Sequence, residues 1–365
     1  MTRPLILVLL ALSLAAQDSR FDVRSRLVVV PVSVTDLKGS SVDGLEAADF
    51  QLLDNGHPQK VAVDTIDTGV APIALVIAVQ VSGISTAALE KVRRIGAMIQ
   101  PIVTGERGCA GVVSFAGRVD WLQECTKDAD ALGRAFSKLR PAADYKADYK
   151  KGRMLDAVQS AVDHLRRQAN ARRVLLLISE SRDRGSEAPL DVVTIAAQSA
   201  GITVYAATYS ALATAFTSKS PVGPPASTRA PSPNPASEET MKTRTGAPPG
   251  KFNPKIPPPE ERVDFIGGLQ ELARLGTANT TEVLAKNTGG TIFSFTREKA
   301  LEEAVQKLGA ELHTQYVLSF VPEASAPGYH TLEVRLSRPG EFRIRSRPGY
   351  WSTEEASPPE KPHDQ

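Results

Sequence analysis

The sequence has too few cysteine and histidine residues for most cofactor chemistry. Its 365 residues include two Cys and five His, and no ligand spacing relates the scattered histidines. Two cysteines cannot form a four-cysteine zinc site, an iron–sulfur cluster or a dense disulfide scaffold. The 43 Lys and Arg nearly balance the 41 Asp and Glu, so a formal charge of +2 gives no general attraction to nucleic acid. We therefore expect no cofactor of these classes and no nucleic-acid partner.

Long apolar runs are absent after the N-terminus. Residues 4–16 (PLILVLLALSLAA) follow one positive charge, but this run is shorter than the roughly 20 residues that a spanning helix needs. It ends in Ser13-Leu14-Ala15, a triplet typical of signal-peptidase cleavage, which predicts a signal peptide over 1–15. The alternative is an uncleaved N-terminal anchor. We expect an exported protein, periplasmic or extracellular, with no membrane span after cleavage.

If the protein is exported, its two cysteines can form a disulfide, because an oxidising compartment maintains such bonds. Two short β-prone runs around Gly117 predict a hairpin. Folding the chain back at Gly117 pairs Val113 with Trp121 and places Cys109 opposite Cys125. Cross-strand partners lie close enough for a disulfide to form after a small adjustment. The alternative is two separate buried thiols.

Apolar patterning divides the chain into segments. From residue 71 apolar strands alternate with amphipathic helices, which predicts a parallel sheet covered by helices, an α/β domain over 71–312. Short strands and Asx-Gly turns predict a small antiparallel β domain over 24–68 and a C-terminal β segment over 313–351. A Pro-rich stretch at about 211–262 is predicted to be a disordered insertion, with a docking segment as the alternative, and 352–365 a disordered tail. The main strands are expected at 73–79, 174–178, 203–207 and 291–295, and the helices at 89–103, 155–165, 263–275, 281–287 and 301–312.

Seven segments together carry a resemblance to a known family, although none is specific alone. They are Val28–Val61, Ile73–Ser85, Val112–Val119, Arg172–Ser186, Thr288–Phe295, Tyr316–Pro322 and Arg347–Trp351. Their order resembles that of the secreted von Willebrand factor A-related proteins of the Acidobacteria type, over roughly residues 25–351. The resemblance implies a doubly wound, mostly parallel sheet (von Willebrand factor A-like, Rossmann-type) flanked by small β units at both ends. It also implies a binding face at the carboxyl ends of the strands.

The resemblance further implies a metal-ion-dependent adhesion site on that face, made of an Asp-x-Ser-x-Ser turn, a Thr and an Asp around a divalent cation. Here Gln80 stands for the first Asp, Ser82 is kept, and Ile84 replaces the second Ser. Arg153 replaces the Thr, and Glu180 stands for the last Asp. A guanidinium would repel Mg²⁺ or Mn²⁺, and Gln80 supplies no countercharge. We therefore predict a degenerate site without metal; residual Mg or Mn binding through Ser82 and Glu180 is the alternative.

Arg153 is predicted to take the place of the metal by pairing with Glu180 and offering donors to an acidic partner. The alternative is that Arg153 points to solvent. Residues 143–150 repeat Ala-Asp-Tyr-Lys beside this face, and exposed tyrosines give large contact area; a tolerated duplication is the alternative. The expected partner-binding residues are Ser82, Tyr145, Tyr149, Arg153 and Glu180.

These features predict a non-enzymatic module that binds another protein, as an adhesion or scaffold-like unit, through the carboxyl-end face. The alternative is a structural envelope component in which that face is vestigial. A serine hydrolase using Ser82 or Ser85 is disfavoured, because the sequence has no Gly-x-Ser-x-Gly elbow. Neither His164 nor His313 has an obvious reason to approach Ser82.

Overall fold

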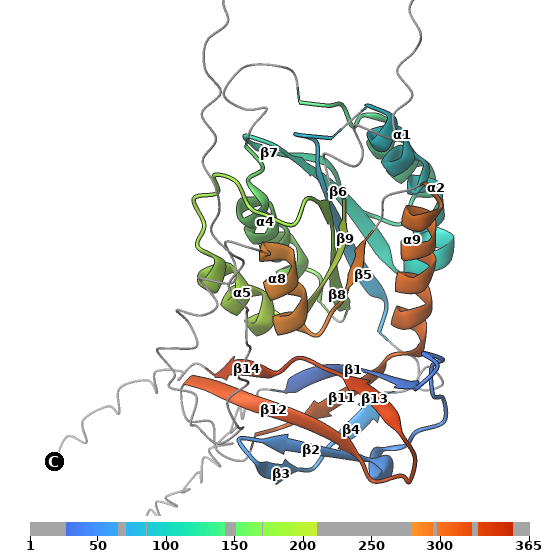
Figure 1. Cartoon of the computed structure of the whole chain (residues 1–365), viewed down its shortest axis with the longest axis vertical. Helices are drawn as coiled ribbons and strands as arrows, with labels where there is room; N and C mark the ends of the chain where they lie inside the picture. The colour runs from blue at the N-terminus through green and yellow to red at the C-terminus, as the bar shows by residue number, and fades with distance from the viewer. Residues whose placement is uncertain are drawn as a thin grey trace, which may run out of the picture.

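A six-stranded sheet forms the centre of the α/β domain in the computed structural model (Figure 1). All neighbouring strands pair in parallel except β6 and β7, which form an antiparallel hairpin. The chain starts in the middle of the sheet at β5 and winds first to one side and then to the other, so the sheet is doubly wound as predicted. In spatial order the strands are β10 (Ile292–Ser294), β9 (Ile202–Thr208), β8 (Arg172–Ser179), β5 (Ile73–Gln80), β6 (Cys109–Phe115) and β7 (Val119–Thr126).

The structure describes only part of the chain. The described residues are 27–64, 71–84, 86–142, 151–169, 171–209, 279–294, 298–322 and 328–352. The predictions for the signal peptide at 1–15, the insertion at 211–262, the tail beyond Ser352, the helix near 263–275, and Tyr145 and Tyr149 therefore lie outside the described residues.

Helices cover both faces of the sheet, and this explains why β5 is buried at every position. Its side chains alternate between two apolar clusters, with Leu75 and Ile77 in one and Val76 and Ala78 in the other. Burial of each large apolar side chain contributes roughly 1.5–3 kcal/mol. The first face is covered by α1 (Thr86–Arg94), α2 (Gly96–Met98), the π-helical η3 (Ile99–Thr104), α3 (Ala129–Ser137) and α9 (Glu298–Thr314). The second is covered by α4 (Met154–Arg166), α5 (Leu190–Ser199) and α8 (Thr280–Thr288).

The hairpin of β6 and β7 carries the predicted disulfide. Cys109 and Cys125 are bonded, with their Cα atoms 5.3 Å apart. Val113 faces Trp121 as predicted, but irregularities between Ala110 and Val113 shift the register. The two cysteines are therefore not directly opposite each other, because a bulge lies between the paired residues and the disulfide.

Strands from both ends of the chain combine into one β unit, which lies against the α/β domain (Figure 1). The segments expected at 24–68 and 313–351 thus share two antiparallel sheets, because β1 pairs with β11 and β13 while β2 pairs with β12. A single apolar cluster fills the unit. One sheet has the order β13 (Phe342–Arg345), β1 (Val28–Asp36), β11 (Tyr316–Phe320), β4 (Ala62–Asp64). The other has β14 (Gly349–Ser352), β12 (Gly328–Leu336), β2 (Phe50–Asp54), β3 (His57–Gln59), with the short η1 helix (Ala47–Asp49) before β2.

A polar cluster around Glu311 joins the two parts at the end of α9. Its carboxylate accepts a hydrogen bond from the Tyr205 hydroxyl at 2.6 Å and pairs with Arg345 of β13 at 2.5 Å. The Ser33 hydroxyl of β1 donates to the same carboxylate at 3.3 Å. Burial raises the pKa of Tyr205, so its hydroxyl stays protonated and keeps donating. The carboxylate therefore has a cation and two donors, which makes its partial burial between the two parts tolerable.

Candidate functional site

The carboxyl ends of β5 and β8 bring together residues that are far apart in the sequence. Gln80 ends β5, and Glu180 follows β8 directly. These strands are neighbours where the chain crosses from one half of the sheet to the other, the place where open α/β sheets usually bind ligands. The loop before α4 lies beside them, because Gly152 and Arg184 exchange two backbone hydrogen bonds of 2.9 and 3.0 Å.

The side-chain amide of Gln80 lies between Ser82 and Glu180. Its Nε2 donates to the backbone oxygen of Ser82 at 3.1 Å, to Ser82 Oγ at 3.4 Å and to Glu180 Oε2 at 3.3 Å. Its Oε1 accepts from the backbone N–H of Glu180 at 3.1 Å. Gln80 and Ser82 are both buried. The two side-chain oxygens that the resemblance assigns to a cation therefore face N–H groups instead.

Glu180 is buried beside this amide and paired with an arginine from its own loop. Arg184 Nη2 lies 3.0 Å from Glu180 Oε2, and the Arg184 side chain is 51% exposed. A charge-assisted hydrogen bond of this kind offsets the burial of a carboxylate. The negative charge of Glu180 is thus compensated from within the chain.

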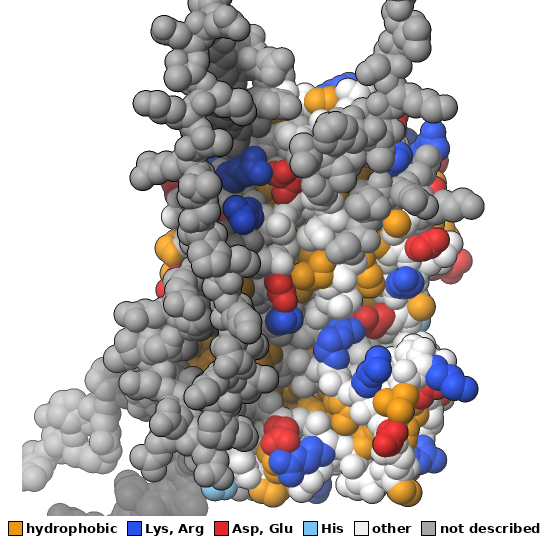
Figure 2. Space-filling view, in the orientation of Figure 1, with side chains coloured by type: hydrophobic (Ala, Val, Ile, Leu, Met, Phe, Trp, Pro, Cys, Tyr) orange, Lys and Arg blue, Asp and Glu red, His pale blue; other side chains and the backbone are white. Residues whose placement is uncertain are grey.

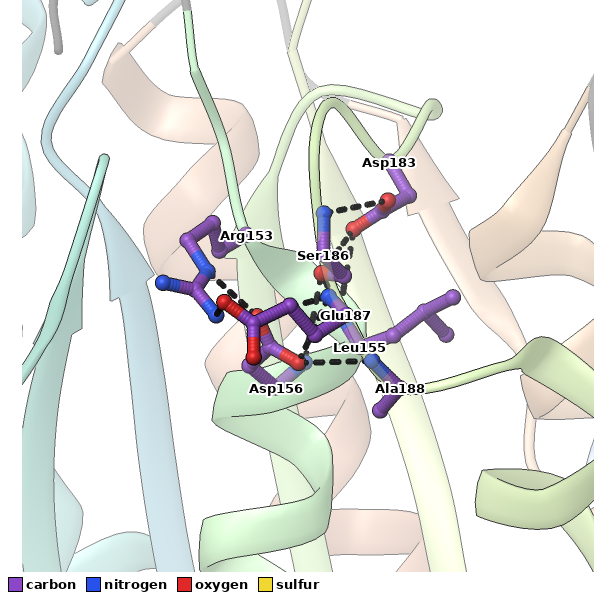
Figure 3. Close-up of polar contacts among 7 residues, drawn as sticks. All are labelled: Arg153, Leu155, Asp156, Asp183, Ser186, Glu187 and Ala188. Carbon is purple, nitrogen blue, oxygen red and sulfur yellow. Dashed lines mark hydrogen bonds and ion pairs between the residues drawn. The ribbon is translucent and has the colours of Figure 1, made fainter.

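Arg153 does not pair with Glu180, so this prediction was wrong. Its Nε lies 2.5 Å from Asp156 Oδ2, and its Nη2 lies 2.8 Å from Glu187 Oε1 (Figure 3). The reason is local, because Arg153 immediately precedes α4 and Asp156 lies three residues later in the first helical turn. An acidic residue is favourable there and reaches a basic side chain at this spacing. The alternative of an arginine that points freely to solvent is also wrong.

The loop after β8 caps the N-terminus of α4. The backbone N–H of Leu155 donates to Asp183 Oδ1 at 3.1 Å and to Ser186 Oγ at 3.0 Å (Figure 3). In return, Asp156 Oδ1 accepts from the backbone N–H groups of Glu187 at 3.1 Å and Ala188 at 2.9 Å. Helix N-termini have unsatisfied N–H groups that such side chains satisfy. The sequence analysis missed these residues, although the polar run after a buried strand marked the loop.

The exposed groups of this face differ from the predicted partner-binding residues. Ser82 and Glu180 are both buried, whereas the side chains of Arg184 and Glu187 are 51% and 86% exposed. Ile84, which stands where the resemblance expects the second serine, is buried in the apolar cluster on the α1 side of the sheet. Basic and acidic side chains are interspersed on the side of the molecule shown in Figure 2.

The donor set at this face does not fit a divalent cation. A cation of this type needs carboxylate and hydroxyl oxygens with available lone pairs, but Gln80 and Arg184 already donate to Ser82 and Glu180. No cluster of three or more His, Cys, Asp or Glu side chains that could hold a metal ion occurs within the described residues.

The two histidines considered for a serine hydrolase have other partners. His164 bonds to the Ser160 backbone oxygen and Glu124 and stacks on Trp121. His313 bonds to the backbone oxygen of Ile102. These contacts assign both imidazoles to helix packing, and they give no support to a Ser–His pair.

The fold and the loops define a doubly wound α/β domain whose carboxyl-end face is filled by its own side chains. No family model matches the chain, and no curated protein is detectably similar to it in sequence. No helix among the described residues is long and apolar enough to cross a membrane.

Among solved structures, the chain is similar to von Willebrand factor A domains. A von Willebrand factor type A protein from Catenulispora acidiphila is 10% identical, with a TM-score of 0.42 over 92% of this chain and 76% of that one. An aerotolerance-related membrane protein from Bacteroides fragilis is 16% identical, with a TM-score of 0.38 over 65% and 98%. The conserved hypothetical protein BatB from Bacteroides thetaiotaomicron is 18% identical, with a TM-score of 0.32 over 38% and 66%. The architecture stated above rests on this chain's own strand order and register.

Proposed function

We propose that this chain is an exported, non-enzymatic module that binds another protein through the carboxyl-end face of its sheet without a metal ion. The observation that carries the proposal is the amide of Gln80, which donates to both Ser82 Oγ and Glu180 Oε2. Internal N–H groups thus bond to the oxygens that a cation would bind in a metal-dependent adhesion site. An acidic side chain of the partner then has no metal to bind and meets a guanidinium instead.

Arg184 is the contact that this proposal places at the centre of the interface. Glu180 holds one side of its guanidinium, while half of the side chain remains exposed. A planar guanidinium binds carboxylates in two-point geometry and is weakly hydrated, so an acidic group on the partner is the matching chemistry. Arg153 and Glu187 add a second, internally neutralised pair nearby. Tyr145 and Tyr149, which lie outside the described residues, would contribute further contact area.

Export is the second part of the proposal. The disulfide between Cys109 and Cys125 is compatible with an oxidising compartment, and residues 1–15 have the pattern of a signal peptide. Expression of the full chain in a bacterial host tests this part. Mature protein in the periplasm or medium that begins at Ala16 supports it, and full-length protein retained in the cytoplasm contradicts it.

A capture experiment tests the binding face. Immobilised wild type, Arg184→Glu and Arg335→Glu are incubated with envelope proteins of the source cell, with and without EDTA. Arg335 is a matched control, because it is an exposed arginine of the β unit paired with Glu333. The proposal predicts a bound protein that is resistant to EDTA, lost with Arg184→Glu and kept with Arg335→Glu. Loss in EDTA favours metal-dependent adhesion, and indifference to both substitutions favours a structural envelope component with a vestigial face.

A further inference from the structure

A cavity of about 430 Å³ lies between the α/β domain and the β unit, away from the carboxyl-end face. Figure 1 shows α5 directly above β14, and residues of both elements line the cavity. Arg173, in the first part of β8, also lines it, so the cavity is near the amino ends of the parallel strands. The walls contain apolar groups such as Val28, Ala200 and Pro322, and none of the lining residues that the structure describes is Asp or Glu.

Arg347 is a buried cation in the wall of this cavity. The residue is 5% exposed, and its Nη1 donates to the backbone oxygen of Gln198 at 3.2 Å. Its guanidinium also lies over the Tyr350 ring, 5.9 Å from the centroid. The Nε has no hydrogen-bond partner in the described part of the chain, where no carboxylate pairs with Arg347 either. Burial lowers its pKa to about 10, so the group remains charged at neutral pH.

Gln198 supplies an unsatisfied acceptor in the same wall. It is 4% exposed, and its Nε2 donates to the backbone oxygen of Asn287 at 2.6 Å. Its Oε1 has no partner among the residues that the structure describes. A buried donor or acceptor without a partner is unfavourable by an amount comparable to a lost hydrogen bond. The wall of the cavity thus combines apolar groups with a charged donor and a neutral acceptor, and a ligand reaches these two buried polar atoms after a small shift of their side chains.

We propose that this cavity binds an N-acylated α-amino acid with an apolar side chain. Its carboxylate meets the guanidinium of Arg347, its amide N–H donates to Gln198 Oε1, and its side chain packs on the apolar wall. Arg173, whose Nη1 is held by the backbone oxygen of Ala200 at 2.8 Å, adds a second positive charge to the cavity. This chemistry belongs both to free N-acyl amino acids and to the C-terminal residue of a polypeptide.

Calorimetric titration of the full chain with matched probes tests each contact. N-acetyl-leucine carries the carboxylate, the N–H and the apolar side chain, whereas N-acetyl-leucinamide lacks the charge and 4-methylpentanoate lacks the N–H. We expect N-acetyl-leucinamide to bind at least about tenfold more weakly than N-acetyl-leucine, because a charge-assisted hydrogen bond is lost. We expect 4-methylpentanoate to be intermediate. Equal binding of the acid and the amide, or no saturable binding of the acid, would overturn the proposal.

Substitutions at Ser199 locate the binding without disturbing the buried groups. Ser199 is exposed, ends α5 and lines the cavity. Ser199→Glu introduces a carboxylate that competes for the cationic wall, and Ser199→Gln is the neutral control of the same size. N-acetyl-leucine is expected to lose at least about tenfold in affinity with Glu and to keep its affinity with Gln. Equal affinity for both variants contradicts binding in this cavity.

The two sources of the ligand are separated by length. Acetyl-Ala-Ala-Leu has the same terminal residue as N-acetyl-leucine and adds two backbone units. Equal or tighter binding of the tripeptide assigns the cavity to polypeptide C-termini. A loss of at least about tenfold assigns it to free N-acyl amino acids, because the added chain then collides with the rim.

Discussion

The carboxyl-end face and the cavity beneath α5 differ in whether their buried polar groups have hydrogen-bond partners. At the carboxyl-end face, the amide of Gln80 uses both its nitrogen and its oxygen, and Glu180 has a cation as well. In the cavity, Arg347 Nε and Gln198 Oε1 have no partner within the described ranges. Because unsatisfied buried groups are rare in folded proteins, these two call for a partner, such as a water molecule or a ligand. At the carboxyl-end face the oxygens of Ser82 and Glu180 are already hydrogen-bonded within the chain, whereas the unpartnered polar atoms lie near the other end of the sheet.

The largest effect is expected for Gln80→Asp. The substitution places a second carboxylate beside Glu180 and removes the amide donors, which we expect to lower the free energy of unfolding by about 3 kcal/mol. It also moves the donor set toward oxygen ligands, so Mg²⁺ should recover part of the loss. Urea denaturation with Mg²⁺ and with EDTA measures both effects. Unchanged stability would show that the amide is not integral to this face.

Gln80→Met is expected to have a somewhat smaller effect. The side chain keeps its approximate length but loses every hydrogen bond to Ser82 and Glu180, whose groups stay buried. Leaving such groups unpaired lowers the free energy of unfolding by about 2 kcal/mol. Urea denaturation is again the measurement, and Mg²⁺ should not restore this variant. A loss below that of an exposed control such as Arg335→Ala contradicts the prediction.

Arg347→Met also replaces a buried polar side chain with methionine, but here we expect the free energy of unfolding to stay nearly unchanged. It removes the bond to the Gln198 backbone oxygen, but it also removes a buried cation that has no carboxylate partner among the described residues. Replacing buried charges with apolar groups of similar size is often neutral or stabilising, so the free energy of unfolding should change by less than about 1 kcal/mol. Chemical denaturation and titration with N-acetyl-leucine are measured together. A large loss of stability would assign Arg347 a purely structural role.

The smallest effect on stability is expected for Arg184→Ala. Only the Arg184 side of its ion pair with Glu180 is half exposed, but the buried Glu180 keeps the Gln80 amide as a donor, so the loss should stay below about 1 kcal/mol. Added salt should weaken the contribution further. Thermal unfolding of the variant at low and high salt checks this, alongside the capture experiment. A loss as large as that of Gln80→Met would show that Arg184 supports the fold rather than a partner.

Local patterns predicted the α/β domain well, because the evidence for each strand and helix lies within its own segment. The apolar run of β5 and the periodicity of α4 are examples. The shared β unit could not be predicted in the same way, since β1 pairs with strands near the other end of the chain. The disulfide was predicted from a hairpin, but the bulge in that hairpin was not.

The candidate sites also depend on contacts between segments that the local sequence does not show. The sequence shows Gln80 and Arg153 at positions where the resemblance expects metal ligands, but it does not show their partners. Arg153 was assigned to Glu180, whereas the acid three residues along its own helix is closer. The quoted segment from Arg347 to Trp351 contains the cavity's cation, yet only packing against α5 shows that this group is buried. Residue types can be judged from a sequence, while the satisfaction of their hydrogen bonds requires the fold.

A metal titration of the wild-type protein tests the central claim most directly. The unfolding temperature is measured in EDTA and with increasing Mg²⁺ or Mn²⁺, for the wild type and for Ser82→Ala. Because a ligand that binds only the folded state raises this temperature, the account predicts no rise in either protein. A rise in the wild type that is lost in Ser82→Ala would contradict it, since Ser82 would then be a metal ligand rather than the acceptor of the Gln80 amide.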